Sequence, residues 1–232
     1  MRILLKVSGE FFGGGEGQAI DVAKTDELAH AILAMKNEGA EIGVVVGGGN
    51  IFRKRYVEHT DVDPIIADYM GITATIINGL LLWDRLRVAG GEAVLQSAWP
   101  IDRVVDGVDP SAAVQAVSSG KVVVFAAGTG VPYVTTDTGV VERAIDVRAD
   151  VIVKATKVDG VYDKDPVVNG DAQKFETLTM AEAIARGLEI MDKEALEKSR
   201  SAGIAIRVVE FSQENLVKVA RGENIGTLVT PE

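Results

Sequence analysis

Short apolar runs recur along the first two thirds of the chain, and longer amphipathic segments separate them. Each run is a few residues long and keeps apolar residues at successive positions, which is the pattern of a strand buried on both faces. These runs predict strands at residues 2–7, 42–46, 93–95, 121–126 and 151–153.

The segments between the runs have the spacing of amphipathic helices. Residues 25–38 illustrate it, because Leu28, Ile32 and Met35 fall on one face and Gly39 follows as a helix stop. Further helices are predicted at residues 68–88, 110–118 and 137–147. Strands that alternate with helices form βαβ units, so the sequence predicts an α/β fold with a mostly parallel central sheet covered on both faces.

The last third of the chain, from about residue 158, has a different sequence pattern. Turn-forming pairs lie close together there, at Asp159-Gly160, Asp165-Pro166 and Asn169-Gly170. The pattern then predicts helices at residues 179–186, 192–202 and 213–221, and strands at 206–210 and 228–230. Because no repeat, low-complexity stretch or linker divides the sequence, we expect a single domain with two functional halves.

Composition narrows the chemistry. The chain carries a formal charge of -10, contains no cysteine and has two histidines, His30 and His59, which we interpret as ordinary surface or packing residues. The lack of cysteine excludes disulfides, thiolate nucleophiles and cysteine-ligated zinc. The acidic balance disfavours a general nucleic-acid-binding protein. Lysine, arginine, aspartate, hydroxyl and backbone N–H groups remain, and this inventory suits phosphoryl transfer.

The N-terminus and the apolar runs predict a location. Charged residues follow Met1 at Arg2 and Lys6, too early for a signal peptide. No apolar run approaches the roughly 20 residues of a membrane-spanning helix. We expect a soluble cytoplasmic protein that binds neither membranes nor nucleic acid.

Two glycine-bearing loops follow predicted strands and carry cations. In Lys6-Val7-Ser8-Gly9-Glu10 the lysine can reach a phosphate, although a motif this short is more often a surface lysine before a turn. Gly47-Gly48-Gly49-Asn50 follows a strand, and Arg53 lies a turn later. Consecutive glycines expose N–H groups to an anion and an arginine can clamp phosphate oxygens, so here we favour an anion site over a flexible turn.

A third loop, residues 128–137, precedes a predicted helix whose N-terminus favours anions. Either Thr135 or Thr136 can cap that helix. Asp137 has two equal interpretations, a favourable first-turn carboxylate or a group that orients a catalytic lysine. Since ligands of open parallel sheets bind beyond the carboxyl ends of the strands, the three loops are expected to line one cleft.

Two further segments have both functional and structural interpretations. Lys154 and Lys157 follow a strand and precede a tight turn and Tyr162, which suits a purine with its phosphates and also an ordinary exposed hairpin. Asp68, near the start of a predicted helix, is either a helix N-terminal charge, the simpler interpretation, or an acceptor for ribose hydroxyls. The sequence lacks the Walker, protein-kinase and dinucleotide-binding signatures, so phosphoryl transfer would need another fold.

Taken together, these segments resemble the bacterial-type UMP kinases of the amino acid kinase superfamily over nearly the whole chain. Each motif is modest, but their order and spacing are specific. They are Lys6-Val7-Ser8-Gly9-Glu10, Gly47-Gly48-Gly49-Asn50-Ile51-Phe52-Arg53, Asp68-Tyr69-Met70-Gly71, Asn78-Gly79, Gly128-Thr129-Gly130, Thr135-Thr136-Asp137, residues 154–162 with Asp165-Pro166, Met191-Asp192, Ile206-Arg207-Val208 and Gly226-Thr227-Leu228.

The resemblance implies a three-layer αβα sandwich that assembles as a homohexamer. Its members transfer the γ-phosphoryl group of ATP, with Mg²⁺, to UMP and give UDP and ADP in pyrimidine nucleotide biosynthesis. Residues 1–232 would form one amino acid kinase domain, with an acceptor and oligomerisation half over about 1–150 and an ATP-binding half over about 151–232. UTP is expected as an inhibitor.

The resemblance also implies roles for individual residues. The expected catalytic residues are Lys6, Arg53, Asp137 and Lys154. ATP is expected to contact Lys6, Val7, Ser8, Gly9, Gly49, Arg53, Thr156, Tyr162 and Asp165. UMP is expected to contact Gly48, Asp68, Thr129, Gly130, Val131, Pro132, Tyr133, Val134, Thr135 and Thr136. No metal held by the protein alone is expected.

The chain departs from the family pattern in two places. Val131 stands where the family often has asparagine, and Val134 where it often has an aromatic residue, which removes a base-edge hydrogen bond and weakens the expected selectivity for uracil. Residues 14–19 resemble the segment linked with GTP activation, but Gln18 and Ala19 replace the usual aromatic–glycine pair, so GTP activation is not expected.

Three other functions are compatible with parts of this pattern. A kinase for a carboxylate or carbamate acceptor would share the donor half, but Asp68 and Thr135-Thr136-Asp137 favour a nucleotide acceptor. A molybdenum storage protein would hold oxyanion clusters, whereas Lys6, Arg53 and Asp137 favour catalysis. A nucleotide-sensing regulatory module would need a second domain to control, and residues 1–232 predict a single domain.

Overall fold

The structure is a computed structural model that describes residues 1–15 and 17–232. Within them, nine strands form one sheet in the order β4-β3-β5-β2-β1-β6-β10-β11-β9. Neighbouring strands run parallel except β10 and β11. The strands are β1 (Arg2–Val7), β2 (Glu41–Val46), β3 (Ala93–Ser97), β4 (Asp106–Gly107), β5 (Val122–Ala126), β6 (Val151–Thr156), β9 (Thr177–Thr179), β10 (Ala205–Glu210) and β11 (Thr227–Thr230).

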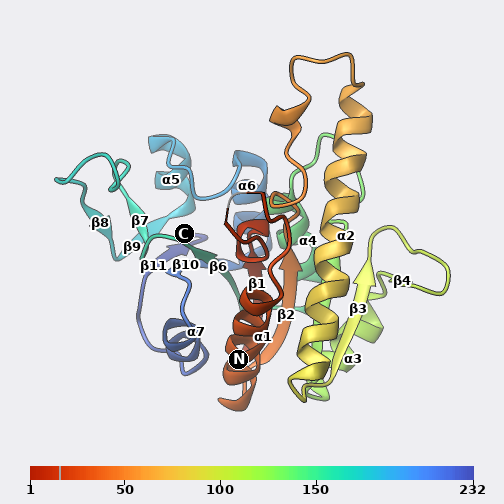
Figure 1. Cartoon of the computed structure of the whole chain (residues 1–232). Coiled ribbons are helices and arrows are strands. Elements are labelled where there is room, and N and C mark those ends of the chain that lie inside the picture. Colours follow the sequence, from red (N-terminus) through yellow and green to blue (C-terminus); the bar gives the residue numbers. More distant parts are fainter. Residues whose placement is uncertain (16) are drawn as a thin grey trace.

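Helices cover both faces of the sheet (Figure 1). Side chains on each central strand alternate between two buried clusters, so Ile3 and Leu5 pack with helix α1 while Leu4 packs on the opposite face with α4. One face carries α1 (Val22–Asn37), α2 (Pro64–Val88) and α7 (Gln213–Ala220), and the other carries α3 (Pro110–Ser118), α4 (Thr136–Val147), α5 (Met180–Arg186) and α6 (Lys193–Ala202). The predicted three-layer sandwich with a mostly parallel sheet is confirmed.

Small elements complete the fold. Strands β7 (Val161–Tyr162) and β8 (Lys174–Phe175) form a separate antiparallel hairpin, which Figure 1 shows at the side of the molecule opposite α2. Short 3-10 helices η1 (Gly9–Phe11) and η2 (Lys54–Tyr56) follow the loops after β1 and β2. The sequence did not predict β4, β7, β8 or β9, because their two or three residues form no continuous apolar run.

Helix boundaries differ from the prediction where polar caps extend the helix. Asp63 caps α2 by accepting a hydrogen bond from Ile65 N, and Pro64 occupies the first turn, so the helix begins four residues before the predicted start at 68. Asp68 therefore lies in the second turn of α2. The interpretation of Asp68 as a helix N-terminal charge is wrong.

Helix α2 also corrects an expectation about membranes. It is the one described helix whose length and composition would allow it to cross a membrane, with a mean hydropathy of 1.6 over its most apolar window, although no such segment was expected from the sequence. Ile76, Leu82 and Leu86 are buried in the core. The apolar character of this side of α2 is accounted for by packing on the sheet.

Candidate active site

The loops after β1 and β2 lie in direct backbone contact. Gly47 N donates to Val7 O at 2.9 Å. A Cβ atom at Gly9 would lie 2.5 Å from Gly49 N, closer than real Cβ contacts. Glycine at position 9 is therefore required for the two loops to meet, and their N–H groups gather at the carboxyl edge of the sheet.

Helix α2 fixes the glycine bend in place. The buried amide of Asn78 donates to Gly47 O and to Asn50 Oδ1, both at 2.7 Å, and Asn50 Nδ2 donates to Asn78 Oδ1 at 3.1 Å. One turn earlier, Thr75 Oγ1 accepts a hydrogen bond from Ala127 N at 2.7 Å. The same face of α2 thus holds the loops that follow β2 and β5.

Two lysines and an aspartate meet above the centre of the sheet. Lys6 of β1 and Lys154 of β6 are register partners on adjacent strands. Lys6 Nζ lies 2.9 Å from Asp137 Oδ1, an ion pair without hydrogen-bond geometry. Lys154 Nζ donates to the carbonyl of Ile190. Of the two interpretations of Asp137, this geometry favours the lysine-orienting group.

Burial is the main cause that lowers the pKa of Lys154, and the charge of Lys6 lowers it further. The carboxylates of Asp137 and Asp192 oppose that shift in pKa. A buried lysine with a neighbouring cation is costly for folding, and such groups are concentrated at functional sites.

The third loop is shaped by strain and by a cap. Thr135 caps α4 by accepting hydrogen bonds from Asp137 N and Thr138 N, so the cap is Thr135 rather than Thr136. Thr135 also donates to Asp192, which precedes α6. Ala127 and Tyr133 adopt left-handed backbone with φ of 63° and 65°. Non-glycine residues in this region store strain, which occurs most often at binding sites.

A pocket of about 270 Å³ opens between α2, the glycine bend and the third loop. Asp68 closes one end, because its Oδ1 lies 3.0 Å from Lys54 Nζ and its Oδ2 accepts a hydrogen bond from Tyr133 N at 3.0 Å. Pro132 and Tyr133 do not line this pocket. The other residues expected to contact UMP do: Gly48, Asp68, Thr129, Gly130, Val131, Val134, Thr135 and Thr136.

A second pocket, of about 560 Å³, lies between the β7–β8 hairpin and the end of α5. Lys154, Thr156, Tyr162 and Asp165 line it together with residues 186–190. The hairpin is thus one wall of a pocket, and the interpretation that this segment holds a purine with its phosphates stays a prediction. Lys6 lines neither pocket, but it contacts Asp137 beside the first and pairs with Lys154 of the second.

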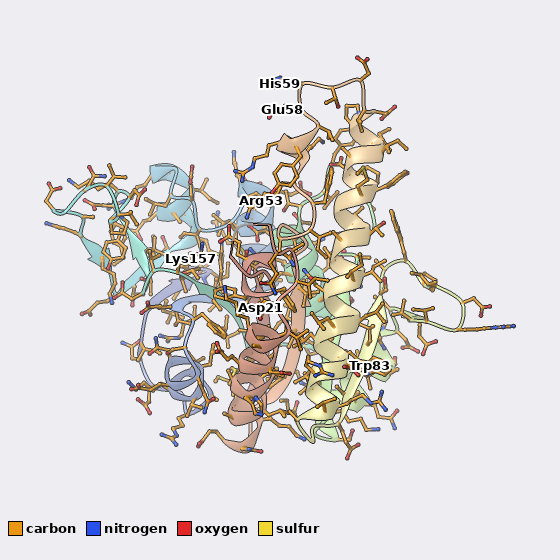
Figure 2. The ribbon with its side chains drawn as sticks, viewed as in Figure 1. Asp21, Arg53, Glu58, His59, Trp83 and Lys157 are labelled. Carbon is orange, nitrogen blue, oxygen red and sulfur yellow. The ribbon has the colours of Figure 1, made fainter. Side chains whose placement is uncertain are left out.

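A further cluster of charge lies next to the glycine bend. Arg53 Nε donates to Gly49 O at 2.7 Å, and Arg53 Nη2 lies 2.5 Å from Glu10 Oε1. Glu10 Oε2 lies 2.7 Å from Lys157 Nζ. Figure 2 labels Arg53 and Lys157 on the loops that follow β2 and β6. These contacts, from Lys157 first and then Arg53, lower the pKa of Glu10 to about 2.

Sequence reasoning assigned no role to Glu10, Asn78 or Thr75, although Glu10 and Asn78 stand inside the quoted motifs. Lys157 was named only as one of two lysines in a segment that suits a purine with its phosphates. The two histidines lie outside both pockets, and Figure 2 places His59 at the far end of the loop before α2. In the described part of the chain no group of three or more His, Cys, Asp or Glu side chains could hold a metal ion. Residue 16 of the 14–19 segment lies outside the described residues.

Comparison with known proteins decides the family. The pattern of the amino acid kinase family matches residues 1–210. The chain belongs to the amino acid kinase family. This amino acid kinase is 42% identical over 232 residues to the uridylate kinase of Yersinia enterocolitica, covering 100% of the chain and 94% of that protein. It is 41% identical over 229 residues to the uridylate kinase of Xanthomonas campestris, with coverage of 98% and 95%.

Solved structures give the same result. The UMP kinase from Bacillus anthracis matches with a TM-score of 0.96 at 32% identity, covering 100% of this chain and 96% of that one. The UMP kinase from Ureaplasma parvum matches with a TM-score of 0.92 at 33% identity, covering 99% and 98%. The resemblance inferred from the motifs is therefore confirmed for this amino acid kinase.

Proposed function

We propose that this amino acid kinase transfers the γ-phosphoryl group of ATP to UMP, giving UDP and ADP in pyrimidine nucleotide biosynthesis. The position of Lys6 is the main support. It lies between a pocket that ends at Asp68 and a pocket that contains Lys154. Positive charge is concentrated where two phosphate tails would meet, and the relatives named uridylate kinase support UMP as the acceptor.

UMP is proposed to occupy the pocket of about 270 Å³ that ends at Asp68, which is called the acceptor pocket below. Its ribose hydroxyls would bind Asp68, and its phosphate would lie near the glycine bend and the N-terminus of α4. Ribose hydroxyls would replace Lys54 and Tyr133 N as partners of the Asp68 carboxylate. The residues proposed to contact UMP are Gly48, Asp68, Thr129, Gly130, Val131, Val134, Thr135 and Thr136, with Pro132 and Tyr133 at the rim.

ATP is proposed to occupy the pocket of about 560 Å³ beside the β7–β8 hairpin, which is called the donor pocket below. Its phosphates would point toward Lys6. The residues proposed to contact ATP are Thr156, Tyr162 and Asp165, which line this pocket, and Lys6, Val7, Ser8, Gly9, Gly49 and Arg53, which lie on β1 and on the loops after β1 and β2. Mg²⁺ is proposed to come with ATP, held by phosphate oxygens and water, because the described residues offer no cluster of three metal ligands. The bound ion would neutralise phosphate charge.

The mechanism follows from charge and alignment. An oxygen of the UMP phosphate attacks the γ-phosphorus in line, and it needs no strong base because a phosphate monoester is largely dianionic above its second pKa of about 6. The barrier is the repulsion between two polyanions and the entropy of aligning them. Lys6, Arg53 and the N–H groups of the glycine bend would stabilise the charge of the transition state. Asp137 would keep Lys6 aimed at the junction.

One assay tests this function. ADP formation from ATP and Mg²⁺ would be measured with UMP, CMP, other nucleoside monophosphates, glutamate and aspartate, one at a time. We expect UMP to give the highest kcat/KM. Turnover with glutamate or aspartate alone would assign a carboxylate kinase instead. Inactivity with every acceptor, together with metal in the purified protein, would favour oxyanion storage.

We also propose that the chain assembles as a homohexamer. The outer face of α2 carries Ile66, Met70 and Ile77, which are 50%, 43% and 40% exposed in the single chain and lie on one side of the helix. An apolar stripe of this kind is typical of a protein interface. Sedimentation should show a hexamer, and Ile77→Lys should dissociate it. Ile145→Lys, at a 44% exposed isoleucine on α4, is the matched control.

Regulation and location follow from the same resemblance. We propose a cytoplasmic enzyme that UTP inhibits and GTP does not activate, because Gln18 and Ala19 depart from the family pattern. Initial rates with UTP or GTP added at fixed ATP and UMP would test both parts. A severalfold rise in rate with GTP would contradict the second part.

A further inference from the structure

Glu10 is an ionised side chain that the mechanism above does not use, and it lines a pocket beside the glycine bend together with Gly49, Arg53 and Lys157. It lies on η1, directly after the β1 loop. Its two oxygens contact two cations, Arg53 Nη2 at 2.5 Å and Lys157 Nζ at 2.7 Å. Arg53 follows β2 and Lys157 follows β6, so one carboxylate joins a cation from each half of the chain.

The contacts of Arg53 fix the orientation of its guanidinium group. Its Nε donates to Gly49 O and its Nη2 to Glu10, so one edge of the planar group is held by a backbone carbonyl and a carboxylate. Neither contact uses Nη1. A guanidinium held along one edge presents its remaining donors in a set direction, which suits recognition of a phosphate.

The charges explain why an acid is present beside a site for anions. Arg53 and Lys157 together carry two positive charges and Glu10 one negative charge, so the cluster keeps a net charge of +1. The two cations lower the pKa of Glu10 to about 2, and the carboxylate therefore stays ionised at neutral pH. Without it, two long side chains on different loops would repel each other and sample many rotamers.

We propose that Glu10 is a positioning residue that holds Arg53 and Lys157, one from each half, in the orientation needed where the phosphoryl group passes. The inference rests on the proposed kinase function. Glu10 itself contacts neither substrate. Because oriented cations lower the energy of the transition state more than that of the bound substrates, its loss should lower kcat rather than raise KM.

Glu10→Gln tests the role of the charge. We expect kcat to fall roughly 10-fold while KM for ATP and for UMP changes less than about 3-fold, because binding groups remain but alignment is lost. Glu10→Asp keeps the charge but is one methylene shorter, and it should give an intermediate kcat. The matched control is Glu38→Gln, which breaks a similar pair with Arg221 Nε and Nη2 remote from both pockets and should leave kcat unchanged.

A second measurement reports the orientation of the Arg53 side chain and does not depend on enzymatic activity. In ¹H–¹⁵N spectra the Arg53 Nε–H resonance, identified by its loss in Arg53→Lys, should exchange slowly with water in the wild-type protein and in Glu38→Gln. It should broaden or disappear in Glu10→Gln. An unchanged resonance and an unchanged kcat in Glu10→Gln would overturn the inference. If the wild-type protein phosphorylated no nucleotide, the proposed function would fail, and the Arg53 resonance would still decide the role of Glu10.

Discussion

The acceptor and donor pockets are built in different ways. Helix α2 holds the loops of the acceptor pocket through hydrogen bonds of two buried side chains, Asn78 to Gly47 O and Thr75 to Ala127 N. The outer wall of the donor pocket is the β7–β8 hairpin. Buried Thr227 anchors its strands by accepting from Val161 N and donating to Phe175 O, and its outer surface carries exposed pairs such as Lys174 with Asp159 at 2.8 Å. Figure 1 shows this hairpin projecting from the edge of the sheet.

This difference has an energetic consequence. Removing one partner of a buried hydrogen bond leaves the other unsatisfied and costs about 1–3 kcal/mol, whereas an exposed ion pair contributes about 0–1 kcal/mol. The contacts that hold the acceptor loops should therefore contribute more to stability than the exposed pairs on the donor wall. Substitutions in the two regions should therefore differ in their effects on the free energy of unfolding and on kcat.

The largest effect is expected between the two pockets, at Lys6. Lys6→Ala removes the cation that contacts Asp137, and kcat should fall by about 10²–10³-fold, the cost of losing one charge-stabilising donor in a transition state. Circular dichroism should show the fold intact. Lys218→Ala, which removes an exposed lysine on α7, is the control and should keep full activity. Near-normal turnover of Lys6→Ala would contradict the proposed mechanism.

Lys154 should show a trade-off between activity and stability. Its folded-state pKa is lowered, so the unfolded chain holds the proton more tightly and the buried charge destabilises the fold at neutral pH. Lys154→Met should lower kcat roughly 10–100-fold and raise the thermal unfolding midpoint by about 2–4 °C.

The pH dependence of that stability gain is the decisive measurement for Lys154. The gain should be present near neutral pH and should shrink as the pH rises toward the usual lysine pKa of 10.5, where the unfolded chain also loses the proton. Unfolding midpoints of both proteins would be measured across this range. A gain that does not change with pH would show that packing rather than charge causes it.

The acceptor side is tested at Asn78. Asn78→Ala leaves Gly47 O and the Asn50 amide without their buried partner, so the free energy of unfolding should fall by about 1–3 kcal/mol. Turnover should fall roughly 10-fold because the glycine bend loses its support. Urea unfolding and initial rates measure the two effects, and a stable variant with normal kcat would show that α2 does not hold the bend.

Selectivity for the base is tested at Val131 in the same pocket. Val131→Asn restores the residue that the family often has, and the added amide could hydrogen-bond to a base edge. We expect the ratio of kcat/KM for UMP over CMP to rise by up to about 10-fold. Val134→Ala, which adds no polar group, is the control. An unchanged ratio in Val131→Asn would place the base beyond reach of this residue.

The smallest effect is expected on the donor wall. Lys174→Met removes an exposed pair with Asp159, and it should change the free energy of unfolding by less than about 0.5 kcal/mol. KM for ATP should change less than about 3-fold, with kcat unchanged. A loss of stability as large as that of Asn78→Ala would remove the distinction between the two regions.

The amino-acid sequence by itself determined the layered α/β fold and the loops that carry the site. Buried parallel strands are short continuous apolar runs, so β1, β2, β5 and β6 were readable one segment at a time. Glycines and charged residues around the ends of those runs marked the loops, and Lys6, Arg53 and Asp137 were named from them. Asp68 was named from the start of a predicted helix. The assignment of a nucleotide acceptor rested on the family resemblance rather than on these patterns.

Only the tertiary structure decided how these loops are held and which groups assist them. Asn78 reaches Gly47 across 31 positions, Thr75 reaches Ala127 across 52, and Glu10 joins Arg53 to Lys157. Local sequence patterns do not encode such contacts, because two residues that are distant in sequence and close in space produce no periodic pattern along the chain. Packing also placed Asp68 in the wall of a pocket rather than in the first turn of α2, and it brought Asp137, a first-turn carboxylate of α4, to 2.9 Å from Lys6.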